Sequence, residues 1–237
     1  MQNTRTEAPG GHPSSYLLPL LQLADSALPT GAFSHSFGLE TFLERGLVHD
    51  EKTFAVWLGQ FIHTQLTYSD GLAIRLALEA GSMDELRQLD AMLTAQALPR
   101  QVREAGVTMG ARMLHIASVI LDSSEIEQYR EDVGRGKCSG HPALAFALAG
   151  RSLQVPLPEL VGTYLFSTAT SLTQNAIRGI PIGQDAGQRV LRQVHPDIAA
   201  ATERIAGLDR GDFGATAPGL EIAQMRHERQ RARMFMS

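Results

Sequence analysis

His35 and Glu40 are the residues best placed for acid–base chemistry, because they follow a turn marked by Pro29 and Gly31. A histidine held near a carboxylate can take up and return a proton close to neutral pH. The same pair can equally cap and orient a helix. The residues therefore leave open a small helical enzyme that uses His35 and Glu40 as acid and base. A closed concave pocket around His35 would favour that reading.

A glycine-rich, basic loop over residues 134–140 comes nearest to a phosphate-binding motif. A P-loop requires the pattern Gly-x-x-x-x-Gly-Lys-Ser/Thr. Here Glu131 stands where the first glycine is needed, and Cys138 follows the lysine. The sequence therefore argues against nucleotide hydrolysis by this chain.

Cys138 and His141 have the spacing of two metal ligands. Two ligands do not close a zinc site, and no second pair lies nearby in the sequence. The other histidines are scattered, so we expect no metal site. Cys138 is the only cysteine, which excludes an intrachain disulfide and favours a reducing compartment.

Composition predicts a water-soluble globular protein in the cytoplasm. The 237 residues are 43% hydrophobic and 19% charged, enough for a sizeable core in one or two domains. No stretch approaches the roughly 18–20 apolar residues of a membrane-spanning helix. A formal charge of −4 disfavours binding to nucleic acid or to an anionic membrane, in spite of the arginines near the C-terminus.

Helix-capping residues recur along the chain, whereas the alternating pattern of strands is missing. Asp50 and Ser82 each precede an apolar stripe with helical spacing, and Asp70 with Gly71 is expected to open a further helix. We therefore predict an all-α, single-domain bundle of about ten helices with essentially no sheet. Residues 1–15 are expected to form a flexible leader, 16–208 the helical domain, and 209–237 a flexible connector with a partner-binding C-terminal segment.

One long helix, expected over about residues 100–121, carries Gly106 and Gly110 four positions apart on one side. Each glycine costs about 1 kcal/mol of helix stability relative to alanine. The spacing therefore predicts a close approach of another helix rather than a chemical role.

Residues 20–44 resemble the N-terminal signature of the UreF-type urease accessory proteins. The matching positions are Leu28, Pro29, residues 31–34 and residues 38–40. The resemblance recurs in the same order at residues 70–71, 89–90, 181–184, 217–218, 225–228 and 233–237. It covers nearly the whole chain after residue 15. Gly179 departs from the family, which usually carries a larger apolar residue there.

The resemblance implies a non-enzymatic scaffold in urease maturation by nickel insertion. Such a protein forms a homodimer, binds the accessory protein UreD (also called UreH), recruits the GTPase UreG and presents the complex to apo-urease. GTP would then be bound by UreG and nickel handled by the complex. The chain itself would hold no cofactor stably.

The resemblance also implies where partners bind. We expect the C-terminal segment to order on UreD/UreH, and its contact residues to be Arg226, His227, Arg233, Met234, Phe235 and Ser237. A second set is expected to face the dimer partner or UreG, namely Phe33, His35, Glu40, Arg178 and Gln184.

Overall fold

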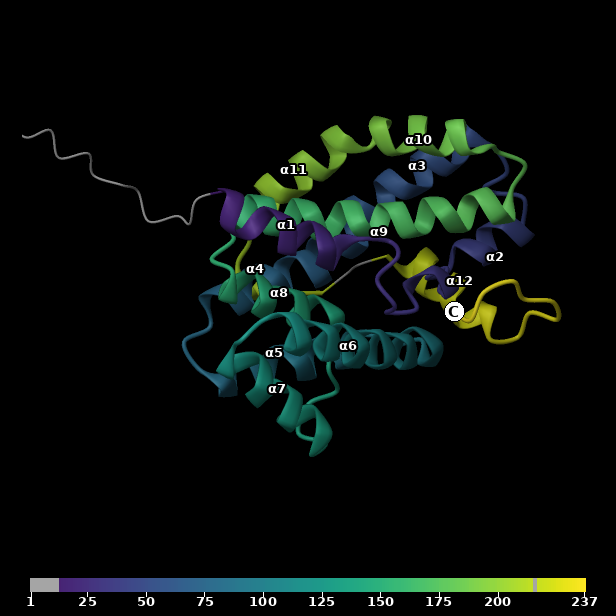
Figure 1. The fold of residues 1–237 in the computed structure, drawn as a ribbon. Helices are drawn as coiled ribbons and strands as arrows, with labels where there is room; N and C mark the ends of the chain where they lie inside the picture. The colour runs from purple at the N-terminus through teal and green to yellow at the C-terminus, as the bar shows by residue number, and fades with distance from the viewer. Residues whose placement is uncertain (1–12, 215–216) are drawn as a thin grey trace, which may run out of the picture.

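The computed structural model describes residues 13–214 and 217–237, and within these two ranges it contains helices and no strand. The prediction of an all-α fold is therefore confirmed. Figure 1 shows the helices arranged in two layers.

The helical elements follow one another along the chain with short connections. They are α1 (Pro13–Ala24), η1 (Ala32–Ser34), α2 (Leu39–Glu44), α3 (Glu51–Phe61), η2 (Ile62–Gly71), α4 (Leu72–Glu79), α5 (Met83–Gln96), α6 (Arg100–Ile120), α7 (Ser124–Gly134), α8 (Pro142–Ser152), α9 (Leu157–Gly179), α10 (Gln184–Gln193), α11 (His195–Ala206), η3 (Arg210–Asp212) and α12 (Pro218–His227).

The centre of the molecule is α8, whose residues from Pro142 to Gly150 are all buried. It packs between α6 on one side and α4 on the other, and alanines at alternate positions allow both helices to come close. In Figure 1, α1, α9, α10 and α11 form one layer and α5, α6 and α7 the other. The short helices α2 and α12 lie together at one side of the molecule, beside the chain end marked C.

Local capping signals were read correctly where the cap and its helix are adjacent in sequence. The Asp50 carboxylate accepts a hydrogen bond from the Thr53 amide at 2.8 Å and begins α3. The Ser82 hydroxyl accepts one from the Glu85 amide at 3.3 Å and begins α5. Side-chain caps of this kind satisfy amides that have no partner inside the helix.

The predicted helix start at Asp70 and Gly71 is wrong. The chain is continuously helical from α3 through α4, and its middle part, η2, is a π-helix. The Thr67 hydroxyl bonds to the Ile62 carbonyl five residues back, at 2.8 Å. Asp70 does not cap a helix because its carboxylate is bonded to Tyr164 of α9, at 2.7 Å.

The glycine-rich loop before α8 is held by Asp90, a buried carboxylate of α5. Asp90 accepts hydrogen bonds from the Ser139 amide at 2.6 Å, the Gly140 amide at 2.9 Å and the Tyr129 hydroxyl at 2.7 Å. Two amides that could have faced a phosphate are thus bonded inside the protein. This geometry agrees with the sequence-based argument against a P-loop.

Cys138 is expected to react slowly with alkylating reagents in the folded protein. Burial, and then the carboxylates of Asp90 and Asp132, raise the pKa of its thiol from 9.0 to about 11. Only the thiolate reacts, so the folded protein should be modified by iodoacetamide about 100-fold more slowly than the unfolded chain. Mass spectrometry of samples with and without urea measures both rates. Equal rates would contradict this assignment of the thiol environment.

Candidate functional site

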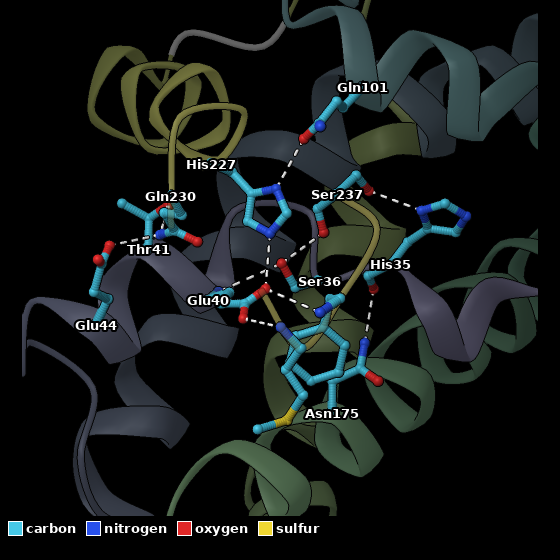
Figure 2. Close-up of polar contacts among 12 residues, drawn as sticks. His35, Ser36, Glu40, Thr41, Glu44, Gln101, Asn175, His227, Gln230 and Ser237 are labelled. Atoms are coloured by element: carbon cyan, nitrogen blue, oxygen red, sulfur yellow. Dashed lines mark hydrogen bonds and ion pairs between the residues drawn. The ribbon is translucent and has the colours of Figure 1, made fainter. Parts of the chain in front are cut away.

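The last residues of the chain pack against the segment between α1 and α2. We call residues 25–38 the elbow and residues 228–237 the tail (Figure 2). The main-chain oxygen of Ser237 accepts hydrogen bonds from the Ser36 amide at 2.5 Å, the Ser36 hydroxyl at 2.6 Å and the Phe37 amide at 3.2 Å. The Met236 amide donates to the Ser34 carbonyl at 2.8 Å. These main-chain bonds fix the tail in one register on the elbow.

His35 links the tail to the long helix α9. Its Nδ1 lies 2.9 Å from the Ser237 hydroxyl, and its main-chain oxygen accepts a hydrogen bond from the Asn175 side chain at 2.7 Å. Its side chain and that of Asn175 are both buried. His35 therefore acts as a connection between the tail and the helical body.

Glu40 is the main side-chain acceptor of the site. It stands in the first turn of α2 and is 9% exposed. Its carboxylate accepts from the Met234 amide at 2.5 Å and the Phe235 amide at 3.1 Å, and it lies 2.7 Å from His227 Nε2. One carboxylate thus binds both the tail and the end of α12.

His227 is fully buried between two oxygen atoms (Figure 2). Nε2 faces the Glu40 carboxylate, and Nδ1 lies 2.8 Å from the Gln101 side-chain oxygen of α6. Through His227, the elbow and tail are joined to the other layer of helices.

The backbone of the elbow requires unusual conformations at its end. Phe37 and Gly38 have φ values of 50° and 94°, and a Cβ at Gly38 would lie 2.8 Å from the Gln224 side chain. Glycine is the residue that accepts positive φ without cost and leaves room for a close neighbour. The Gln224 amide in turn donates to the Phe37 carbonyl at 3.1 Å, so α12 holds this bend in place.

Phe235 is the apolar anchor of the tail. It is 5% exposed, and the guanidinium carbon of Arg178 lies 4.9 Å from the centre of its ring. Arg178 also donates to the Phe33 carbonyl and to the Asn175 side chain. The arginine is therefore held in place by the elbow and by α9 and covers the buried ring.

The outer side of the tail is apolar and basic. Met234 and Met236 are 57% and 66% exposed, and Phe33 of the elbow is 56% exposed. The arginines of α12 and the tail are also exposed; they are Arg226, Arg229, Arg231 and Arg233. None of these four arginines forms an ion pair in the described part of the chain. The tail, α12 and the elbow therefore expose both apolar and cationic groups.

The structure brings most of the sequence-predicted site residues together. His227, Phe235 and Ser237 meet His35, Glu40 and Arg178 at one buried cluster. Arg226, Arg233 and Met234 point to solvent beside it. Gln184 is different, because it begins α10, is exposed, and has no hydrogen bond to this cluster among the described residues.

The docked tail differs from the sequence-based expectation of a segment without packing of its own. Residues 217–237 contain few apolar side chains, but Ser36 of the elbow and Glu40 of α2 supply a donor and an acceptor that pair with their main chain. Those partners are nearly 200 positions away in sequence, so no local pattern reveals them. The assignment of the tail to partner binding stays a prediction.

Gly179 is explained by its neighbour on α2. A Cβ at this position would lie 2.4 Å from Leu43 Cδ1. A leucine side chain therefore occupies the space that a larger residue at 179 would fill. The departure from the family pattern is compensated within the fold.

The alternative of an acid–base pair receives no support from the geometry. His35 contacts Ser237, whereas Glu40 contacts His227 and two tail amides. No hydrogen bond joins the two side chains in the described structure, and His35 does not line the cavity that is bounded by Asp70 and Met113. The Glu40 carboxylate oxygens and His35 Nδ1 are instead engaged in structural contacts.

His35 is expected to make tail docking dependent on pH. Burial, followed by the charge of Arg112, lowers the pKa of His35 below its ordinary value of 6.5. An undocked His35 therefore takes up a proton first as the pH falls. The contribution of neutral His35 to the stability of the docked tail is complete above about pH 6.5. It is lost as the pH falls from there through the lower pKa that His35 has in the docked state. Amide exchange of the tail, measured between about pH 8 and pH 5, should show this loss. A His35→Gln variant should lack this part of the dependence, and an unchanged profile would contradict it.

The described residues offer neither a metal site nor a membrane span. No group of three or more histidine, cysteine, aspartate or glutamate side chains is placed to hold a metal ion in residues 13–214 and 217–237. His141 Nδ1 instead accepts from the Ala143 amide at 3.3 Å and caps α8. None of the helices described is both long and apolar enough to cross a membrane.

Comparison with known proteins identifies what the chain is similar to. The UreF family model matches residues 48–195. The urease accessory protein UreF of an Arthrobacter species is 61% identical over 223 residues, covering 94% of this chain and 98% of that protein. UreF of Paenarthrobacter aurescens is 57% identical over 224 residues, covering 94% and 99%. UreF of Corynebacterium efficiens is 49% identical over 220 residues, covering 93% and 96%.

Proposed function

Because this chain belongs to the UreF family of urease accessory proteins, we propose that it is a non-enzymatic scaffold for nickel insertion into urease. In this role a cytoplasmic homodimer binds UreD/UreH, recruits the GTPase UreG and presents the complex to apo-urease. GTP is bound by UreG, and nickel is handled by the complex without a stable site in this chain.

The observation that supports this role best is the division of the tail into a buried side and a free side. Phe235 and Ser237 are buried on the elbow, whereas Met234 and Met236 next to them are exposed. Exposed methionines with unpaired arginines suit a partner surface that has apolar pockets and acidic groups. The polar contacts under the tail hold this surface in one shape.

We assign the UreD/UreH contact to this free side, with Arg226, Arg233 and Met234 as direct contacts. His227, Phe235 and Ser237 act indirectly, because they are buried and keep the tail docked. A docked tail loses less conformational freedom on binding than a disordered one, which favours affinity. The elbow surface at Phe33 and the exposed start of α10 at Gln184 remain our candidates for the dimer or UreG-facing contacts.

A pull-down with UreD tests this assignment. Truncation from Met225 onward should abolish capture while the circular dichroism of the helical body is retained. A sharper variant combines Arg233→Ala with Met234→Ser, two exposed positions whose change leaves the buried contacts in place. We expect it to weaken capture at least tenfold, since interface anchors contribute about 1–2 kcal/mol or more each.

The matched control is Val119→Ser at the far end of α6, where the side chain is 70% exposed. It removes a comparable exposed apolar group outside the tail surface. Equal capture of UreD by the control and by the tail double variant would overturn the assignment, as would full capture by the truncated chain.

A further inference from the structure

A cavity of about 330 Å³ lies between the two layers of helices. Its wall is mainly apolar and comes from α1, α3, η2, α6 and α8, through Leu23, Phe61, Leu66, Met109, Met113 and Phe146. Pockets that hold small molecules begin at about this size and have this kind of lining. Phe37 and Gln224 also line it, whereas none of the described tail residues 228–237 does.

Asp70 places a carboxylate on the wall of this cavity. One of its oxygens accepts from the Tyr164 hydroxyl at 2.7 Å. Burial, and then the charge of Asp70, raise the pKa of Tyr164 well above its ordinary value, so the phenol keeps its proton and donates. This contact fixes the orientation of the carboxylate and leaves its second oxygen available.

The second oxygen of Asp70 has an incomplete set of donors. It lies 2.7 Å from the Ser69 hydroxyl, which also lies 2.8 Å from the Gln65 carbonyl. A hydroxyl carries one proton and can donate to only one of these acceptors at a time. A carboxylate can accept about four hydrogen bonds. The half-buried Asp70 therefore has unused acceptor capacity at the cavity wall, where a ligand can supply an additional donor.

His141 adds a donor to the same wall. Burial lowers its pKa despite the opposing charges of Asp70 and Asp90, so the ring is neutral. Its Nδ1 accepts from the Ala143 amide, which places the ring proton on Nε2. Within the described part of the chain, Nε2 has no hydrogen-bond partner, and it lies beside Gly106 at the cavity wall.

The charged groups around the cavity favour a cation. Among the described residues, the carboxylates of Asp25, Asp70 and Glu221 line it, against the one guanidinium of Arg103. Arg103 is bonded to the carbonyls of Ala97 and Leu98 at the end of α5. With His141 neutral, the lining has an excess of negative charge, which stabilises a positive ligand more strongly in a confined apolar space than in water.

We propose that this cavity binds a small organic amine, whose ammonium group donates to Asp70 and whose hydrocarbon part packs against the apolar lining. A polar atom of the ligand can also accept the Nε2 proton of His141. Nothing in the scaffold role requires such a ligand, so the proposal goes beyond the proposed function.

Calorimetric titration of the full chain at neutral pH tests the charge preference with three probes of the same shape. They are phenethylamine, phenethyl alcohol and phenylacetate. We expect the amine to bind at least tenfold more tightly than the alcohol, and phenylacetate not to bind. Asp70→Asn should remove the preference for the amine. Asp197→Asn, which removes a partly exposed carboxylate paired with His63 away from the cavity lining, should leave the preference unchanged.

The unmodified protein provides a second measurement that does not depend on how the variant folds. With methyl-labelled methionine, phenethylamine should show nuclear Overhauser contacts to Met109 and Met113 of the cavity. The exposed Met234 and Met236 serve as internal controls and should show none. The proposal is overturned if amine and alcohol bind equally, if no binding is seen at millimolar concentration, or if the contacts lie on the exposed methionines.

Discussion

Replacing Glu40 with alanine is expected to release the tail from the elbow. The change leaves the buried His227 ring and the Met234 and Phe235 amides without their acceptor. Each buried donor without an acceptor costs about 1–3 kcal/mol. Releasing the tail into water therefore costs less free energy than keeping these three donors buried and unpaired. Since 1.4 kcal/mol corresponds to a factor of ten, amides of residues 234–237 should exchange about 100-fold faster or more.

Glu44→Ala is the matched control for this experiment. Glu44 lies one turn along the same helix and accepts from the Gln230 side chain at 2.8 Å in an exposed position. Loss of an exposed bond should change tail exchange less than threefold, since its net contribution is about 0.5 kcal/mol. Similar protection of the tail in the two variants would contradict the central place given to Glu40. Hydrogen exchange followed by mass spectrometry compares both chains.

Gly110→Ala is expected to destabilise the whole fold by about 3 kcal/mol or more, the upper end of the cost of overpacking. A Cβ at this position would lie 2.1 Å from the Gly140 carbonyl oxygen and 2.8 Å from its carbon. The obstacle is backbone, held in turn by Asp90 through the Gly140 amide, so it cannot move aside as a flexible side chain does. Urea unfolding monitored by circular dichroism measures the loss.

Gly106→Ala supplies the comparison one turn earlier on α6. There a Cβ would lie 3.6 Å from the His141 ring, an ordinary contact distance. Alanine should therefore be tolerated and gain up to about 1 kcal/mol from its helix propensity. If both alanine variants unfold at the same urea concentration, the close approach of α6 to the start of α8 is not as the structure places it.

Features that depend on neighbouring residues could be predicted from the sequence. The cap at Asp50 and the cap at Ser82 are each contained within a few positions. The paired glycines of α6 correctly indicated a close approach, although only Gly110 makes it. Such signals work because a helix end must satisfy its amides locally.

The site could be predicted only in part, because its contacts join distant segments. Glu40 meets His227 at a separation of 187 positions and Phe235 at 195. The resemblance to the UreF family marked residues 38–40, 225–228 and 233–237 without indicating which of them touch. The predicted helix start at Asp70 was wrong for the same reason, because the Tyr164 hydroxyl that donates to Asp70 lies 94 positions away. An aspartate that caps a helix and an aspartate that accepts a hydrogen bond from a distant residue look the same in the sequence. Only the fold decides which donor reaches the carboxylate.

The structure connects these distant residues into one account of the protein. Buried contacts between the elbow and the tail shape an exposed surface, and the proposed scaffold role depends on that surface. The Glu40→Ala variant therefore should fail in maturation although none of its exposed residues has changed.

The nickel content of urease tests this account most directly. Urease purified from cells that lack this chain should contain little nickel and show little activity, and expression of the chain should restore both. Expression of Glu40→Ala should restore much less than Glu44→Ala does. Urease with a full complement of nickel in the absence of this chain would contradict the proposed role.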